Sequence, residues 1–545
     1  MSKLTKIAIL PAMMCMTALG SSVGTAPGYA ATSSSPDASR PNVIIILADD
    51  LGYADTSANP GGRFETPNID RIAEQGVRFT DGYATAPVCA PSRAGLLTGR
   101  YPERFGFEYN VGGAPRALRE GLGLSTDQIT IAQLLKDAGY HTGLIGKWHE
   151  GEQSQFYPMN RGFDEFVGFL PGASSYIDPT LPGVHLAFRG FSDDILHSLV
   201  LGKTRQIDRA ALGATVGKEL ATKGAAANDQ KLAKAGARLA STFERRPLNQ
   251  IVEGADHHVV HNEDQYLTDY FADRAARYIT ENAKGGKPYF LYLAFNAPHM
   301  PFMVTDKYYD RFPEIKDHQL RVYAAMIAAL DDGIGEVLNA VKQSGEADNT
   351  MIVFASDNGC AAYIPGLCSN TPLRGGKLSF YEGGIRVPFL MSWPGHITPG
   401  TVYHNPVSLM DVLPTALAAS GGKLPTDRPY DGVDLMPYLS GRIAGPPHDM
   451  LIWQSKPLVA IRLGEWKLRE TEKDANTSVY GHYKLLFNLR DDRNESTNLS
   501  QKDADKLREL EDLLHEWEIP MVAPKWPTKR PVTYQIDGIT FTLPV

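Results

Sequence analysis

The chain has 545 residues, of which 43% are hydrophobic and 21% are charged, and its formal net charge is −8 at pH 7. This length suffices for a large buried core and exceeds one ordinary domain, so we expect one large and one small domain. A net negative charge argues against nucleic acid as a partner. Beyond the leader described next, we find no stretch apolar enough to span a membrane.

The first 30 residues have the pattern of a secretory signal peptide. Lys3 and Lys6 form a positive segment, the run from Ile7 to Leu19 is short and apolar, and Gly28-Tyr29-Ala30 is a small-x-small cleavage site. We therefore expect residues 1–30 to be removed and the mature protein to be periplasmic or secreted.

Strands and helices alternate after this leader. Buried strands are predicted at 42–50, 140–145, 288–295 and 351–355, and helices at 66–76, 130–138 and 320–341. This alternation predicts an α/β fold with a large mixed, mostly parallel sheet sandwiched by helices. In such a fold, ligands bind outside the carboxyl ends of the strands.

The pattern changes near residue 446. Short strands are predicted at 450–453, 458–468 and 483–489, and an amphipathic helix at 501–518, which together form a small α+β lobe with an antiparallel sheet. A segment at about 170–262 is too long for a structureless loop, and it contains possible helices at 194–201 and 230–243. The predicted domains are therefore 41–445, with an insertion at about 170–262, and 446–545.

Three cysteines remain once the leader is removed. Cys360 and Cys368 are close in sequence, and in an oxidising compartment we expect them to form a disulfide. Two free thiols are the alternative. In either case Cys89 is left without a partner.

Acidic and amide side chains follow two of the predicted strands. They are Asp49-Asp50 and Asp357-Asn358. Each pair alone is typical of a helix cap. If the two strands are neighbours, however, three carboxylates converge and repel one another. A divalent cation with oxygen ligands would relieve that repulsion, and Ca²⁺ is favoured over Mg²⁺.

Basic side chains follow strands on the same side of the predicted sheet. Lys147 and His149 follow one strand, His299 follows another, and Lys377 lies beyond the Asp357-Asn358 pair. Each alone would be an ordinary solvated residue. Grouped around a metal ion, they would bind an oxyanion.

The segment Cys89-Ala90-Pro91-Ser92-Arg93 has the pattern C-x-P-S-R and continues as AGLLTGR. With it, the chain resembles the type I, formylglycine-dependent sulfatase family of the alkaline phosphatase superfamily. The resemblance extends from about residue 41 to residue 499, apart from the insertion. Its other motifs, in order, are GKWH at 146–149, RGFD at 161–164, PH at 298–299, SDNG at 356–359, and GK at 376–377 with YEGG at 381–384.

This resemblance implies an unusual nucleophile. A formylglycine-generating enzyme would recognise the C-x-P-S-R segment before folding and convert Cys89 to the aldehyde formylglycine. One hydroxyl of the hydrated aldehyde would attack sulfur, and deprotonation of the second would then expel sulfate. The route divides one difficult step into two easier ones.

The resemblance also implies a role for each matched position. The implied ligands of one Ca²⁺ ion are Asp49, Asp50, Cys89, Asp357 and Asn358. The implied catalytic groups are Cys89, Arg93, Lys147, His149, His299 and Lys377. Arg93 and Lys147 would hold the diol, and His149 would be the base. His299 would donate a proton to the leaving group, and it would bind the substrate together with Lys147 and Lys377.

The implied activity is that of a sulfatase, a sulfuric ester hydrolase of the arylsulfatase type. Its substrate would be a sulfate ester of a small molecule or an oligosaccharide, and a sulfated polysaccharide is favoured. One alternative is a formylglycine-dependent phosphodiesterase or phosphonate monoester hydrolase of the same superfamily. Another is an inactive glycan-binding protein, which the occupied catalytic positions disfavour. In the insertion, Arg189, His197, Arg205 and His257 could contact the substrate, although a solvated surface position is favoured for each of them.

Overall fold

The computed structural model describes residues 40–111, 114–179, 181–187, 251–260, 264–472, 483–527, 532–536 and 539–543. Contacts group Arg40–Val545 into one compact unit. The predicted signal peptide at 1–30 and the helices predicted at 194–201 and 230–243 lie outside the described residues.

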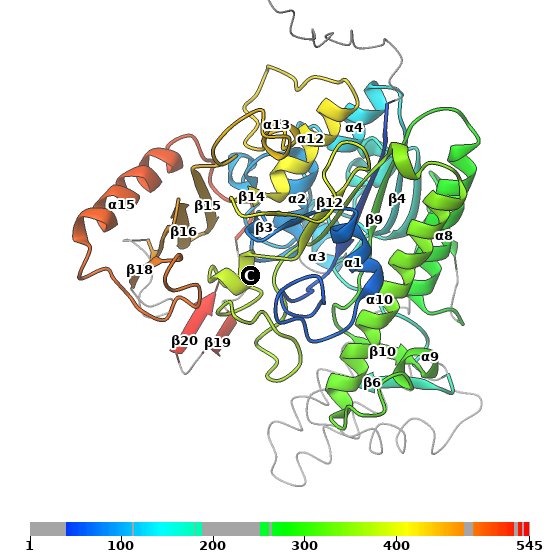
Figure 1. The fold of residues 1–545 in the computed structure, drawn as a ribbon, viewed down its shortest axis with the longest axis horizontal. Helices are drawn as coiled ribbons and strands as arrows, with labels where there is room; N and C mark the ends of the chain where they lie inside the picture. Colours follow the sequence, from blue (N-terminus) through cyan, green and yellow to red (C-terminus); the bar gives the residue numbers. More distant parts are fainter. Residues whose placement is uncertain are drawn as a thin grey trace, which may run out of the picture. The chain divides into compact units, whose positions relative to one another are not determined.

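A ten-stranded sheet forms the centre of this unit (Figure 1). In sheet order its strands are β13 (Thr401–Tyr403), β2 (Gly76–Phe79), β12 (Phe389–Ser392), β11 (Thr350–Ser356), β1 (Asn42–Ala48), β9 (Tyr289–Ala294), β4 (His141–Lys147), β5 (Glu165–Phe169), β7 (Ile251–Glu253) and β8 (His258–Val260). The five strands from β11 to β5 are parallel to one another, whereas β12, β7 and β8 are antiparallel to their neighbours. The predicted mixed, mostly parallel sheet is confirmed.

Both faces of the sheet are buried, as the apolar run of β1 predicts. Ile44 and Ile46 pack into one apolar core, whereas Val43, Ile45 and Leu47 pack into the other, because successive side chains of a strand point to opposite faces. The first core is shared with α1 (Pro67–Glu74), α8 (Leu267–Ala283) and α10 (His318–Gln343). The second is shared with α2 (Cys89–Thr98), α4 (Ile131–Asp137) and α12 (Val412–Ala419). A continuous β-branched run therefore corresponds to a strand covered by helices on both sides.

Helix boundaries follow local capping signals only in part. Thr130 accepts a hydrogen bond from the Gln133 N–H at 3.2 Å, and the Gln133 side chain accepts one from the Thr130 N–H at 2.9 Å, which is a capping box at the start of α4. Gly76 was expected to end the first helix, but α1 ends at Glu74 and Gly76 begins β2. Among the described residues, no helix is long and apolar enough to cross a membrane.

The C-terminal lobe is a four-stranded antiparallel sheet with one helix. Its elements are β15 (Met450–Ser455), β16 (Leu458–Leu463), β17 (Trp466–Thr471), β18 (Lys484–Asn488) and α15 (Ala504–Glu518). The segment expected as one stretch at 458–468 is two strands, β16 and β17, paired antiparallel. Leu510, Leu514 and Trp517 of α15 pack against this sheet. A hairpin of β19 (Val532–Ile536) and β20 (Ile539–Leu543) follows.

Shorter elements connect these parts. They are β3 (Gly82–Tyr83), η1 (Pro102–Phe105), α3 (Ala114–Glu120), η2 (Ser154–Phe156), η3 (Pro158–Arg161), β6 (Val184–Ala187), β10 (Phe302–Thr305), α9 (Asp306–Tyr309), η4 (Ala347–Asn349), α11 (Glu382–Ile385), β14 (Val407–Ser408), η5 (Leu409–Asp411) and α13 (Met436–Leu439). Strand β10 pairs with β6, and β14 pairs with β3, outside the central sheet.

Buried ion pairs join the lobe to the main domain, and we call them the junction network. Its members are Asp81, Glu382, Glu495, Arg386, Arg462 and Lys467. The Lys467 ammonium lies 2.8 Å from Glu382 and 3.0 Å from Glu495. Arg386 lies 3.1 Å from Glu382 and 2.7 Å from Asp81. The main domain and the lobe thus share one set of buried charges.

Candidate active site

The carboxyl ends of four adjacent parallel strands, β11, β1, β9 and β4, form one edge of the central sheet. Ala48 of β1 pairs with Ser356 of β11, so the residues that follow each strand, Asp49-Asp50 and Asp357-Asn358, lie side by side. This pairing satisfies the condition on which the sequence-based metal prediction rests. Lys147 ends β4, two strands away from β1.

Acidic and amide groups converge at this edge. The Asp50 N–H donates to Asp357 Oδ1 at 3.2 Å, and the Asn358 amide donates to Asp50 Oδ1 at 2.7 Å. Asp50 has a φ of +64°, in the left-handed region that non-glycine residues rarely adopt. The surrounding hydrogen bonds hold this strained conformation, as is common at functional sites.

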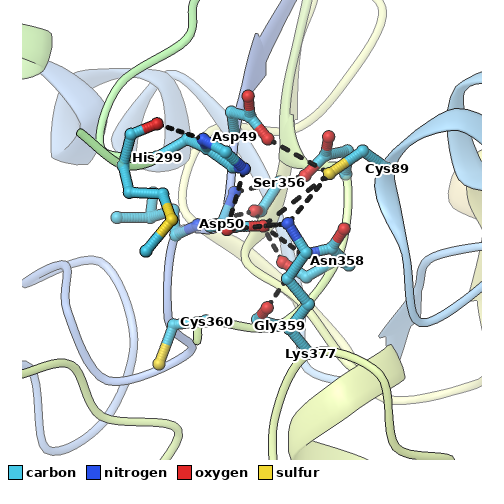
Figure 2. A network of polar contacts seen from close by, with 12 residues as sticks. Asp49, Asp50, Cys89, His299, Ser356, Asn358, Gly359, Cys360 and Lys377 are labelled. Atoms are coloured by element: carbon cyan, nitrogen blue, oxygen red, sulfur yellow. Dashed lines mark hydrogen bonds and ion pairs between the residues drawn. The ribbon is translucent and has the colours of Figure 1, made fainter. Parts of the chain in front are cut away.

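Cys89 lies against this cluster, as Figure 2 shows. It is the first residue of α2 and is 1% exposed. Its thiol donates to Asp49 Oδ1 at 3.5 Å, and the Lys377 ammonium donates to its sulfur at 3.1 Å. The sequence motif at residue 89 and the two strand-end pairs, which are distant in sequence, therefore form one site.

Each carboxylate of the cluster has a basic partner. Lys147 lies 2.6 Å from Asp49, and Lys377 lies 2.7 Å from Asp50. The third pair is Arg93 with Asp357, at 2.8 Å. Three cationic side chains therefore balance three carboxylates, so charge repulsion alone does not require a metal ion at this site.

A different observation fits a cation. Asn358 Oδ1 is buried and has no hydrogen-bond partner, which is costly unless a ligand is bound there. One ligand atom from each of Asp49, Asp50, Cys89 and His299 lies within 4.8 Å of the others. His299 was not predicted as a ligand. Asp357, which was, directs one oxygen to Arg93 at 2.9 Å. Hard oxygen donors of this kind suit Ca²⁺.

Burial makes the unmodified Cys89 thiol a weak nucleophile. Desolvation raises the pKa of this thiol above its usual range, although Lys147 and Lys377 act in the opposite direction. Because the thiolate and not the thiol is the reactive form, a plain cysteine at this position is inert at neutral pH.

The two histidines of the site differ in their surroundings. Burial, together with Lys147 and Arg93, lowers the pKa of His149 well below its usual range, so the ring is neutral. His149 Nδ1 is buried without a hydrogen-bond partner, and the residue has a φ of +63°. His299 Nδ1 lies 2.6 Å from the Met300 carbonyl oxygen, and its Nε2 lies 3.6 Å from Asp50. Since a carbonyl only accepts, Nδ1 of His299 carries a proton.

A family model described as Sulfatase matches residues 41–422. The chain belongs to the sulfatase family. It is 37% identical to the mouse steryl-sulfatase over 440 residues. The aligned region covers 75% of this chain and 67% of that protein. It is 31% identical over 433 residues to the human N-acetylgalactosamine-6-sulfatase, covering 78% of this chain and 71% of that protein.

Solved structures agree. That of Ps i-CgsB in complex with k-i-k-neocarrahexaose superimposes with a TM-score of 0.71 at 31% identity, covering 89% of this chain and 94% of that chain. The resemblance inferred from sequence motifs is confirmed, and with it sulfuric ester hydrolysis as the activity.

The sulfatase brings most of the sequence-predicted residues into contact. Cys89, Arg93, Lys147, His299 and Lys377 each lie within 4 Å of a cluster carboxylate, whereas no side-chain hydrogen bond is seen for His149. In the insertion, Arg189, His197 and Arg205 lie outside the described residues. His257, which is described, is exposed and stacks on Tyr157 with ring centroids 3.8 Å apart.

Sequence reasoning missed supporting residues of this site. Ser356 Oγ accepts from the Leu51 N–H at 3.0 Å and donates to the Asn358 carbonyl at 2.8 Å, so it links the two strand ends. Its place in the SDNG motif was the available signal. Cys360 and Cys368 form a disulfide in the loop that follows.

Proposed function

We propose that this sulfatase hydrolyses sulfate esters of a carbohydrate, with a formylglycine derived from Cys89 as nucleophile and one Ca²⁺ ion. The observation that carries the proposal is the position of the Cys89 sulfur, 3.5 Å from Asp49 and 3.1 Å from Lys377. The contacts of this buried thiol with both a carboxylate and an ammonium group support a chemically modified side chain at this position.

The charges support an anionic substrate. Three carboxylates and three cationic side chains balance one another, so a bound divalent cation leaves two positive charges unmatched. A sulfate monoester brings one negative charge into this excess. In a buried site of low dielectric, that attraction is stronger than it would be in water.

The proposed ligands of the ion are Asp49, Asp50, Asp357, Asn358 and the modified side chain at position 89. The unpartnered Asn358 oxygen supports this set. A bound Ca²⁺ would polarise the sulfate oxygens and favour the ionised nucleophile. His299 Nε2 belongs to the same group of possible ligand atoms, yet calcium prefers oxygen, so we assign His299 to the substrate.

Three residues would hold the side chain at position 89. The Lys147 ammonium lies 2.6 Å from Asp49, on the carboxylate that the Cys89 thiol contacts. Arg93 lies one helical turn after Cys89 on α2 and is fixed by Asp357 at 2.8 Å. Because its pKa lies below the usual range, His149 is neutral and has a ring nitrogen that can accept a proton.

Two residues face the leaving group. Lys377 contributes positive charge, and contact with Asp50 raises its pKa well above the usual range despite burial. His299 already holds a proton on Nδ1 through Met300. To donate a proton to the departing alcohol from Nε2, the ring must therefore be the imidazolium. Burial lowers the pKa of His299, and the negative charges of Asp49, Asp50 and an anionic substrate oppose that shift and favour the imidazolium.

The substrate class rests on the relatives. One is named for a sulfated amino sugar and another was solved with k-i-k-neocarrahexaose. We propose a sulfated polysaccharide or an oligosaccharide derived from it. The insertion at about 170–262 and the C-terminal lobe would frame the leaving-group pocket, since insertions near strand ends commonly determine specificity. The leader at 1–30 supports export to the periplasm or beyond.

The mass of the tryptic peptide Phe79–Arg93, from protein made in its native host, tests the nucleophile. We expect the mass of the aldehyde at Cys89. A thiol in every molecule would exclude the formylglycine assignment. Cys89→Ala should lower the turnover of 4-nitrophenyl sulfate by at least about a thousandfold, and unchanged turnover would contradict the role of residue 89. This result also tests the inactive glycan-binding alternative.

Substrate preference is tested separately. The rate on 4-nitrophenyl sulfate should exceed the rate on an aryl phosphodiester of matched leaving group. A panel of sulfated oligosaccharides, followed by release of inorganic sulfate, then identifies the sugar. Hydrolysis of aryl sulfate without sulfate release from any glycan of the panel would count against the carbohydrate assignment.

A further inference from the structure

Three loops that carry site residues meet at one side chain outside the predicted set, that of Asn370. The first loop follows β1 and carries Asp50. The second follows β11 and carries Asn358. The third leads to Lys377. Asn370 is 4% exposed and lies in the segment between the second and third loops.

The Asn370 amide bonds to each of these loops. Its oxygen accepts from the Tyr53 N–H at 3.2 Å and from the Cys360 N–H at 3.2 Å. Its nitrogen donates to the Gly375 carbonyl at 3.0 Å. These backbone groups are three residues after Asp50, two after Asn358 and two before Lys377. One planar amide thus fixes the spacing of all three loops.

The segment that carries Asn370 is itself anchored. The Ser369 N–H donates to Asp55 at 3.1 Å, and the Ala54 N–H donates to the Ser369 carbonyl at 3.0 Å. On the other side, Cys368 is bonded to Cys360. A side chain held from both directions loses little conformational freedom when it makes its own hydrogen bonds.

The second and third loops are also joined directly. The Lys377 N–H donates to the Cys360 carbonyl at 2.8 Å. The Cys360 carbonyl therefore accepts a hydrogen bond from the Lys377 N–H, and the Cys360 N–H donates one to the Asn370 side chain. A shift of Asn370 would move Cys360, and with it both Asn358 and the backbone of Lys377.

We propose that Asn370 is a positioning residue for sulfate ester hydrolysis, which sets the distance of Lys377 and Asn358 from Asp50. The inference rests on the proposed function, and it assigns to Asn370 no contact with the substrate. Misplacement of a catalytic group by about 1 Å can cost about a hundredfold in rate. Substitution of Asn370 should therefore weaken sulfate binding and slow catalysis by more than its effect on stability would explain.

The test compares Asn370→Ala with a matched variant, Asn42→Ala. Asn42 is also 4% exposed, and its amide donates to Glu346 at 3.0 Å and accepts from the Tyr289 N–H at 3.1 Å. It lies at the opposite end of β1 from the site. Both full-length variants, produced together with a formylglycine-generating enzyme, are compared in melting temperature, in kcat and KM for 4-nitrophenyl sulfate, and in the Kd of inorganic sulfate by calorimetry.

For Asn370→Ala we expect kcat/KM to fall about a hundredfold and the Kd of sulfate to rise about tenfold. For Asn42→Ala both should stay within about twofold at a similar loss of melting temperature. The proposal is overturned if Asn370→Ala retains both native values, or if Asn42→Ala loses as much as Asn370→Ala.

A second variant keeps the proposal testable if Asn370→Ala does not fold. Asn370→Asp retains the acceptor oxygen for Tyr53 and Cys360 and removes the donor to Gly375. We expect kcat/KM to fall about tenfold, and a native value would overturn the proposal. If the native protein does not hydrolyse sulfate esters, the proposed function fails. In that case, the Kd of sulfate for the native protein and the Asn370 variants still decides whether Asn370 positions the residues that bind the anion.

Discussion

The active site and the junction network contain the same inventory of charge, three carboxylates and three cationic side chains, and both are buried. They differ in how the charges are shared. In the junction network, Lys467 and Arg386 each lie within about 3 Å of two carboxylates. At the site, Lys147 lies 2.6 Å from Asp49 and Lys377 lies 2.7 Å from Asp50. Arg93 lies close to Asp357, at 2.8 Å, whereas its distance to a second carboxylate, that of Asp49, is 3.8 Å.

This difference separates a structural ion network from a binding site. Charge balance alone does not distinguish them. The convergence of possible ligand atoms does distinguish them. At the site, ligand atoms of four residues lie within 4.8 Å of one another, and the buried Asn358 Oδ1 has no hydrogen-bond partner. The junction network instead uses its carboxylates to hold two parts of the chain together. We therefore expect damage to the first region to affect activity and damage to the second to affect stability.

Two buried lysines, both 0% exposed, provide the sharpest test of this comparison. Lys467→Met leaves Glu382 and Glu495 without their shared cation and should lower the free energy of unfolding by about 3–5 kcal/mol. Lys147→Met should lower kcat/KM by about a hundredfold or more, with a smaller loss of stability. Urea unfolding and 4-nitrophenyl sulfate kinetics measure both effects. The comparison fails if the folded Lys467→Met protein loses as much kcat/KM as Lys147→Met.

The pH dependence of stability tests the lobe interface at Glu108. Burial raises the pKa of Glu108 from 4.5 to about 7, although the Lys456 N–H and the Gln454 amide donate to it. Its contribution to stability is fully present below pH 4.5 and is lost as the pH rises through 7, a total of up to about 3 kcal/mol. Urea unfolding of Glu108→Gln between pH 4.5 and 7.5 should lack this decline, with kcat within about twofold of native. If the free energy of unfolding changes with pH in the same way for the native protein and Glu108→Gln, this contribution of Glu108 would be disproved.

The smallest expected effect concerns the unpartnered oxygen. Asn358→Ala removes a proposed ligand and should raise the Kd of Ca²⁺ about tenfold. Calorimetric titration with Ca²⁺ after removal of metal by EGTA measures the change. Asn42→Ala is the control, and its Kd should equal that of the native protein. An unchanged Kd for Asn358→Ala would remove Asn358 from the ligand set.

Much of the fold could be predicted because the central strands are apolar on both faces. The runs around Ile44, Phe290 and Val353 correspond to β1, β9 and β11 within about two residues. Boundaries that depend on tertiary contacts were less predictable. Gly76 is suited to end a helix, yet it lies in β2, where a Cβ would meet the Met391 carbonyl oxygen at 2.0 Å. The sheet, and not the helix, requires that glycine.

Most residues that the structure brings together at this edge of the sheet are named by sequence motifs, because these motifs are short and follow strand ends. The contacts between these residues could not be predicted from the sequence. Nothing in the sequence indicates that Arg93 contacts Asp357, 264 residues away. Nor does any local pattern single out Asn370, whose bond to Tyr53 spans 317 residues. Supporting contacts of this kind arise only when distant loops are brought together by the completed sheet.

If Cys89 is converted to formylglycine, as we propose, the burial of α2 sets a time limit on that conversion. All ten residues of this helix are buried, and Cys89 is 1% exposed, so a modifying enzyme would have access to position 89 only while the chain is unfolded. Modification and folding would then compete, and the active fraction would rise with the rate of modification relative to the rate of folding. A host that folds the chain faster than it modifies it accumulates a stable but inactive protein. Slower synthesis or folding would raise specific activity without any change of sequence.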